Sequence, residues 1–174
     1  MTSPPRPARR SVAIRNAHPQ LQVPRAAVRR AIALLDARAD RFGGGCPAGE
    51  LSLVFLTDAA LARIHADFMA DPSPTDVITF AGDPAAGLAG EVCVSVDTAA
   101  RYVGLPRAAA RPSRATDRQA KFASELTLYL VHGWLHLAGY DDLAPAKKRR
   151  MRAAEKRALA LLRAARAIPA FLLV

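Results

Sequence analysis

The chain has 174 residues, of which 51% are apolar and 23% charged, and its formal net charge is +10. This composition is typical of a globular protein and excludes fibrous and disordered chains. No run approaches the ~20 apolar residues of a membrane-spanning helix, and no signal peptide follows the basic N-terminus, so we expect a cytoplasmic protein. Cys46 and Cys93 form no Cys-x-x-Cys pair, which argues against a disulfide framework and a thiolate zinc site.

Positive charge is concentrated at the two ends of the sequence. Residues 1–30 hold seven arginines and no acidic residue, and residues 101–174 hold fifteen basic and five acidic residues. Residues 31–100 hold ten acidic and three basic residues. Clustered cationic groups neutralise phosphates and release counterions, so the pattern favours a nucleic-acid-facing surface. The alternative is that these charges only solvate helices rich in Arg and Ala.

The hydrophobic pattern predicts an α/β domain of layered α+β type, in which about four strands form one sheet packed with about five helices. Residues 1–10 are expected to be a disordered basic tail, and residues 11–174 a single domain. Residues 104–117 are expected to form a flexible basic loop. The expected strands are residues 11–16, 51–56, 76–80 and 91–96. The expected helices begin at Pro24 and Asp58 and cover residues 117–138 and 145–167.

The second of these helices has an apolar face of three residues. Asp58 is expected to cap its first turn. Leu61, Ile64 and Phe68 recur at helical spacing, so all three are expected to pack against the core.

A central apolar helix carries two histidines four residues apart, His132 and His136. At this spacing the β-carbons lie ~5 to 6 Å apart, so both imidazoles can bind one metal ion. Two polar rings in an apolar helix are costly without partners. Gly139 can end the helix in a left-handed turn, which would bring Asp141 or Asp142 to the same point. Two imidazoles, one carboxylate and an open position are typical of a catalytic zinc site.

The segment at residues 132–142, His-Gly-Trp-Leu-His-Leu-Ala-Gly-Tyr-Asp-Asp, resembles the signature of the YbeY family of metal-dependent endoribonucleases. In that family three histidines of this segment hold a zinc ion. Residues 74–80, Pro-Thr-Asp-Val-Ile-Thr-Phe, and residues 90–95, Gly-Glu-Val-Cys-Val-Ser, resemble two strands of the same family. The resemblance extends over roughly residues 50–160.

This resemblance implies a single-strand-specific, zinc-dependent endoribonuclease that acts in ribosomal RNA maturation, including 3′-end processing of small-subunit rRNA, and in ribosome quality control. The implied ligands of one zinc ion per chain are His132, His136 and Asp142. A water bound to this ion is the expected nucleophile, and the carboxylate would also suit Mn²⁺ or Fe²⁺. The implied partners are RNA and the small ribosomal subunit, with no membrane and no identified protein. The general base is either Asp141 or Asp76, or a metal-bound hydroxide acts without a protein base.

The chain departs from the family pattern at two positions. Asp142 replaces the third histidine, which lowers the charge at the ion by one and is expected to leave the bound water less acidic. Met69 stands where the family has an arginine that is thought to bind phosphate, and is expected to pack at a helix end. Phosphate contacts must then come from other residues, including the basic run at 147–152, whose alternative role is a solvated face. The candidate RNA-binding residues are Arg63, Arg118, Lys121, Arg149 and Arg150.

Two alternatives compete with the ribonuclease hypothesis. The ligand spacing also fits the metzincin proteases, but their general-base glutamate would stand at position 133, which is Gly133 here. The second alternative is a non-catalytic, metal-stabilised ribosome- or RNA-binding protein, which the departures at Asp142 and Met69 would allow.

Other residues are given simpler roles. Trp134 and Tyr140 are expected to pack around the metal-binding helix, with stacking on bases as the alternative. Glu125 is expected to serve the electrostatics of its helix, and the alternative is that it orders the site through water. His18 and His65 lack a companion at ligand spacing and are given no role.

Overall fold

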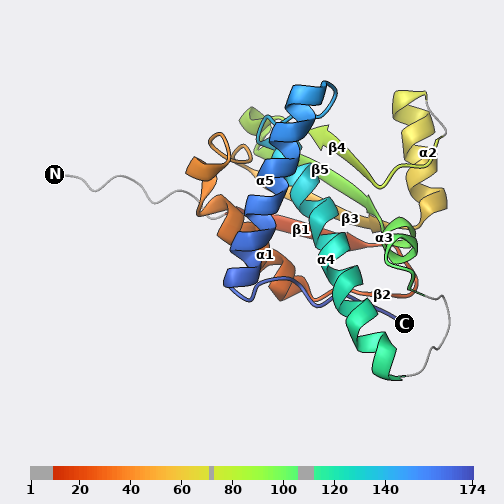
Figure 1. The fold of residues 1–174 in the computed structure, drawn as a ribbon. Coiled ribbons are helices and arrows are strands. Elements are labelled where there is room, and N and C mark those ends of the chain that lie inside the picture. Colours follow the sequence, from red (N-terminus) through yellow and green to blue (C-terminus); the bar gives the residue numbers. More distant parts are fainter. Residues whose placement is uncertain (1–9, 71–72, 106–111) are drawn as a thin grey trace.

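A four-stranded mixed sheet lies at the centre of the structure (Figure 1), a computed structural model that describes residues 10–70, 73–105 and 112–174. The strand order is β1-β3-β5-β4. The first three strands of this order run parallel, and β4 pairs antiparallel with β5 at one edge. The predicted four-stranded sheet is therefore confirmed. The strands are β1 (Val12–Asn16), β3 (Glu50–Leu56), β4 (Val77–Ala81) and β5 (Leu88–Ser95).

Different helices cover the two faces of the sheet, because successive side chains of each strand point to opposite faces. Leu51, Leu53 and Phe55 of β3 face the main core, to which α1, α4 and α5 contribute. Val54 and Leu56 face a smaller cluster beneath α2. Figure 1 shows α4 and α5 side by side across the main face. The helices are α1 (Arg25–Asp36), α2 (Asp58–Met69), α3 (Val96–Tyr102), α4 (Pro112–Leu137) and α5 (Pro145–Ala164).

The predicted apolar face of α2 is only partly confirmed. Phe68 is 72% exposed, although its ring meets that of Phe80 with centroids 5.2 Å apart, because Phe80 belongs to the edge strand β4 and covers one side of the ring. The helix is capped by Thr57, whose hydroxyl accepts a hydrogen bond from the third residue beyond it. Asp58 is the first helical residue, and its carboxylate binds side chains of α3 and Ser95 instead.

The hydrophobic pattern did not predict two short elements, the helix α3 and a second, two-stranded sheet. Ser95 ends β5 and caps α3, so the helix begins at Val96, which was expected to lie in the strand. A second sheet pairs β2 (Leu21–Gln22) with β6 (Leu172–Leu173) and so joins the segment after β1 to the C-terminal segment. Strands of two residues are too short to show any periodicity.

Much of the predicted tail and part of the predicted basic loop, residues 1–9 and 106–111, lie outside the described residues. Arg10 belongs to the fold, because its guanidinium donates to the Asp36 carboxylate and to backbone carbonyls before β3. The helix α4 already begins at Pro112, within the predicted loop.

The two cysteines are both buried and free. Burial raises the pKa of Cys46 to about 11 and that of Cys93 to about 12. Among the described residues, no helix is long and apolar enough to cross a membrane.

A glycine allows α4 to lie directly on the sheet. A β-carbon at Gly133 would lie 2.3 Å from Cγ1 of Val92 and 3.1 Å from Oγ1 of Thr79. Such distances leave no room for any side chain at this position. The neighbouring Trp134 is fully buried, with its ring edge-on to Phe42, which confirms its predicted packing role.

Candidate metal centre

The end of α4 turns the chain back toward its own last histidine. Gly139 has φ 90°, a left-handed conformation that favours glycine. Its amide donates to the carbonyl of His136, and the amide of Tyr140 donates to the carbonyl of Leu135, both at 3.0 Å. These two bonds form a Schellman motif. The turn brings Asp142 beside the two histidines.

The three predicted ligands meet at one point. Nε2 of His132 lies 2.9 Å from Nε2 of His136. The Asp142 carboxylate oxygens lie 3.9 Å from the first of these nitrogens and 3.7 Å from the second. Atoms that bind one ion at ~2.0 to 2.2 Å are themselves about 3 to 4 Å apart. The arrangement therefore has the dimensions of a metal site, and the ligand roles stay a prediction.

The other ring nitrogens explain why this site suits a cation. Nδ1 of His132 lies 2.7 Å from the carboxylate of Glu155, and Nδ1 of His136 lies 3.0 Å from the carbonyl of Tyr140. Both partners only accept hydrogen bonds, so Nδ1 of each ring carries a proton, and in its neutral form each ring turns a lone pair outward at Nε2. Two lone pairs 2.9 Å apart repel each other unless a cation lies between them. The residues present therefore fit a metal ion.

The electrostatics of the two rings differ. Burial lowers the pKa of His132, but the hydrogen bond and charge of Glu155, with the charges of Asp142 and Asp76, outweigh burial, so this pKa is raised. Burial and the neighbouring His132 lower the pKa of His136. The surrounding carboxylates thus stabilise positive charge at the site.

Glu155 is a residue that the sequence analysis missed. It is the only acidic residue of α5, and it stands on a helix rich in Lys and Arg. It follows the buried Met151 by one helical turn, so it faces α4. A lone carboxylate on the buried side of a basic helix is the signal that could have identified it.

Two hollows adjoin the candidate ligands and share Asp76, His132 and Asp142. The first, here called the β4 groove, has a volume of about 650 Å³ and runs along β4. The second, here called the Tyr102 hollow, has a volume of about 200 Å³ and lies between α3, α4 and α5. The β4 groove is also lined by His65, Met69, Thr75, Thr79 and Leu143. The Tyr102 hollow is also lined by Tyr102, Glu125, Tyr129, Lys148, Arg152 and Glu155.

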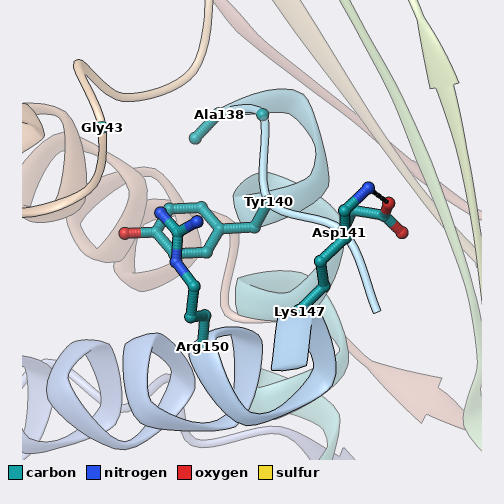
Figure 2. Close-up of a pocket in the computed structure, with 7 residues that line it drawn as sticks. Gly43, Ala138, Tyr140, Asp141, Lys147 and Arg150 are labelled. Atoms are coloured by element: carbon teal, nitrogen blue, oxygen red, sulfur yellow. Dashed lines mark hydrogen bonds and ion pairs between the residues drawn. The ribbon is translucent and has the colours of Figure 1, made fainter. Parts of the chain in front are cut away.

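A third hollow, of about 280 Å³, lies behind the turn that follows α4 (Figure 2). Lys147 and Arg150 reach into it from α5, toward Asp141 and Tyr140. Nζ of Lys147 lies 2.7 Å from the Asp141 carboxylate, and this hydrogen bond lowers the pKa of Asp141. Asp141 is therefore held by α5 and is not a member of the ligand group.

Most of the predicted RNA-binding residues lie away from the ligands. Arg118 and Lys121 are on α4, about four and about three turns before His132. Arg149 and Arg63 are exposed but line none of the three hollows. Arg150 alone of this set lines a hollow next to the candidate ligands.

The residues around the β4 groove correct one further expectation. Met69 is 56% exposed and lines the groove, so its expected packing at a helix end is wrong. His65 lines the same groove, and its Nδ1 lies 2.9 Å from the carbonyl of Ser73. Both residues belong to the last turns of α2 and line the groove together with residues of β4.

Fold and site together define a class: an α+β protein whose longest helix presents two histidines and a following carboxylate that could hold one metal ion, the kind of ligand set found in metal-dependent hydrolases. The family whose sequence model matches residues 13–163 is described as endoribonuclease YbeY. The chain belongs to this family. Gly133 lies against the sheet in this fold, so no general base can stand where the metzincin proteases place theirs.

Individual relatives agree with this assignment. The chain is 38% identical over 119 residues to an endoribonuclease YbeY of Chlamydia pneumoniae, covering 66% of this chain and 70% of that protein. It is 36% identical over 126 residues to that of Geobacter sulfurreducens, covering 68% and 76%. It is 30% identical over 141 residues to that of Chloroherpeton thalassium, covering 81% and 88%. A solved structure from Thermotoga maritima, 18% identical, shares the fold with a TM-score of 0.53 over 91% of this chain and 94% of that one.

Proposed function

We propose that this protein is a metal-dependent endoribonuclease that cleaves single-stranded RNA during ribosomal RNA maturation, including 3′-end processing of small-subunit rRNA, and ribosome quality control in the cytoplasm. The observation that carries the proposal is the pair of outward-facing Nε2 lone pairs beside Asp142, at the floor of an open groove. The relatives named above are endoribonucleases, which supports the same activity.

The proposed ligands of one Zn²⁺ ion are His132, His136 and Asp142. When bound, a divalent ion would polarise a phosphoryl oxygen and lower the pKa of a coordinated water. Two imidazoles and one carboxylate suit Zn²⁺, and the carboxylate also suits Mn²⁺ or Fe²⁺. Glu155 and the Tyr140 carbonyl hold the two rings in the orientation that this site requires.

Asp76 is better placed than Asp141 to accept a proton during the reaction. Asp141 is paired with Lys147, and its lowered pKa makes it a weak base. Asp76 is exposed and lines both the β4 groove and the Tyr102 hollow beside His132. We therefore assign the general base to Asp76.

The cations of α5 support binding of a polyanion around the ligands. Lys148 and Arg152 line the Tyr102 hollow, and Arg150 lines the hollow behind the turn. If these contacts dominate, RNA affinity falls as salt rises, with a logarithmic slope of about −0.7 for each neutralised phosphate of a single strand.

The test is cleavage of an end-labelled single-stranded RNA, and of its duplex, by the metal-loaded protein. We expect internal cleavage of the single strand, loss of cleavage with a chelator, and loss of cleavage in His136→Ala protein with an unchanged circular dichroism spectrum. A folded, metal-loaded protein that binds this RNA without cleaving it would instead support the non-catalytic RNA-binding alternative.

A further inference from the structure

The Tyr102 hollow lies beside the candidate ligands, and the proposed function leaves open which part of the RNA it holds. It shares Asp76, His132 and Asp142 with the β4 groove, so the two form one continuous path past the candidate ligands. A polynucleotide that lies along the β4 groove with one phosphate at the ligands therefore reaches this hollow with the next nucleotide.

An exposed aromatic ring stands at the rim of the hollow. Tyr102 is the last residue of α3 and is 75% exposed. Unpaired bases stack on such rings, and this interaction tolerates every base because each has a π face. A duplex cannot offer a base in this way without unpairing it.

Two cations stand on the α5 side of the same rim. Lys148 and Arg152 are exposed and four residues apart, so their side chains project on the same side of α5. Within the described part of the chain, neither side chain has an ion-pair or hydrogen-bonding partner. The nearby Lys147, by contrast, is paired with Asp141. Lys148 and Arg152 are therefore available to bind a phosphate.

The floor of the hollow has the opposite charge. Glu125 and Glu155 line it together with Asp76 and Asp142. These carboxylates repel a phosphate, but carboxylate oxygens accept hydrogen bonds from the exocyclic amino group of a base. The distribution of charge thus suits one orientation of a nucleotide, with the base inside and the phosphate at the rim.

We propose that the Tyr102 hollow is the subsite for the nucleotide next to the scissile phosphate, with the base stacked on Tyr102, its edge toward Glu125, and its phosphate bound by Lys148 and Arg152. This inference rests on the proposed function, because it takes single-stranded RNA as the ligand. It also assigns a preference: a base with an amino group, adenine, cytosine or guanine, binds better here than uracil.

The first experiment measures binding of a fluorescein-labelled single-stranded oligoribonucleotide by anisotropy, in the His136→Ala background so that the RNA stays intact. Tyr102→Ala weakens binding about fivefold or more, the effect of losing one stacked base, whereas Tyr102→Phe keeps the affinity. Phe68→Ala is the matched control, because Phe68 is equally exposed but lies outside the hollow. Equal effects of Tyr102→Ala and Phe68→Ala would overturn the subsite.

The second experiment tests the two cations through the salt dependence of the same binding reaction. Lys148→Ala and Arg152→Ala each reduce the logarithmic salt slope by about 0.7 if each side chain binds a phosphate. Lys156→Ala is the control, since Lys156 is exposed on α5 but does not line the hollow. An unchanged slope in both rim variants would show that neither side chain binds the backbone.

The third experiment locates the nucleotide on the RNA. A single abasic residue is moved along a cleavable oligonucleotide, and binding and cleavage are compared for wild-type and Tyr102→Ala protein. At one position beside the cleavage site, the abasic residue should reduce the RNA affinity of the wild-type protein as much as Tyr102→Ala reduces its affinity for intact RNA. The same abasic residue should cause no further loss of affinity in the Tyr102→Ala protein. Uracil at that position should bind less tightly than cytosine.

The outcomes separate the two proposals. If wild-type protein cleaves single-stranded RNA but Tyr102→Ala cleaves and binds it equally well, the subsite is wrong and the proposed function stands. If wild-type protein neither cleaves nor binds RNA, the proposed function fails and the subsite fails with it.

Discussion

Glu155 accepts a hydrogen bond from Nδ1 of His132 at 2.7 Å, and this contact links α5 to the helix that carries the candidate ligands. The Glu155 side chain is 17% exposed, so the bond is largely protected from water. A carboxylate behind a ligand histidine fixes the ring orientation and makes the other nitrogen a stronger donor to metal.

Replacing Glu155 tests this relationship. Glu155→Gln keeps the shape of the side chain but removes its charge, so we expect metal affinity to fall about 10- to 100-fold. Isothermal titration with Zn²⁺ measures the change. Glu125→Gln is the control, because Glu125 lines the same hollow without bonding a candidate ligand. A similar loss in both variants would point to general electrostatics and not to the bond with His132.

Removing the histidines should remove the metal. His132 and His136 are each partly exposed, so truncating them to Ala leaves the core intact. Elemental analysis of the purified protein is expected to show about one metal equivalent in the wild type and none in the double variant. Full retention of metal in a folded double variant would mean that the ion binds elsewhere.

The two adjacent aspartates should behave differently. Asp142 lies within 3.9 Å of the His132 Nε2 atom, whereas Asp141 is paired with Lys147. Asp142→Asn is therefore expected to weaken Zn²⁺ binding by about tenfold or more, because a neutral amide is a poor zinc ligand, and Asp141→Asn should have little effect. The opposite ranking in a competition assay with a chelating dye would assign the third ligand to Asp141.

Gly133→Ala is expected to destabilise the protein even though alanine favours helices. The new methyl group would overlap the Val92 side chain, and such overpacking costs about 1 to 3 kcal/mol, more than the helix propensity of alanine returns at ~1 kcal/mol. Urea unfolding of metal-free protein measures the free energy. Adding Val92→Ala should recover part of the loss, since it removes the two overlapping methyl groups. A stabilised Gly133→Ala protein would show that α4 can move off the sheet.

Asp58 makes the free energy of unfolding depend on pH in the acidic range. Burial raises the pKa of Asp58, but hydrogen bonds from Ser95, Arg101 and Thr98 outweigh burial, so this pKa lies below its ordinary value. A carboxyl group with a lowered pKa stabilises the fold above its unfolded pKa of about 3.9, and this contribution disappears as the pH falls through the folded pKa.

Asp58→Asn should therefore be less stable than the wild type at pH 5 to 7, with the difference shrinking below pH ~3.9. Urea unfolding across this pH range measures both proteins. A stability difference that is independent of pH would show that the Asp58 charge contributes nothing.

Local patterns predicted the framework of the fold because its main elements bury apolar side chains at strand or helix spacing. β3 buries them on both of its faces, and α4 buries Phe122, Leu126 and Leu130 at helical spacing. The pattern was wrong where packing partners decide the outcome: Phe68 has the spacing of a core residue, but it meets the edge strand β4 and stays 72% exposed. The pairing of Leu21–Gln22 with Leu172–Leu173 joins segments about 150 residues apart, which no local signal reports.

In the candidate site, too, the residues close together in sequence were predicted, and those brought in by packing were not. His132, His136 and Asp142 lie within eleven residues, so helix periodicity and one glycine turn are enough to bring them together. Glu155 and Tyr102 come from other elements, and only the packing of α3 and α5 against α4 places them at the site.

The backbone of Tyr140 makes two hydrogen bonds, one to the helix α4 and one to a candidate ligand. Its amide closes the end of α4 on Leu135, and its carbonyl accepts the hydrogen bond from His136. Fraying of the last helical turn therefore frees the His136 ring. An ion that binds only the ordered ring stabilises the closed turn against fraying by its own binding free energy. Hydrogen exchange at the Tyr140 amide consequently reports occupancy of the site, because the logarithm of its rate falls in proportion to the free energy by which bound metal stabilises the closed turn.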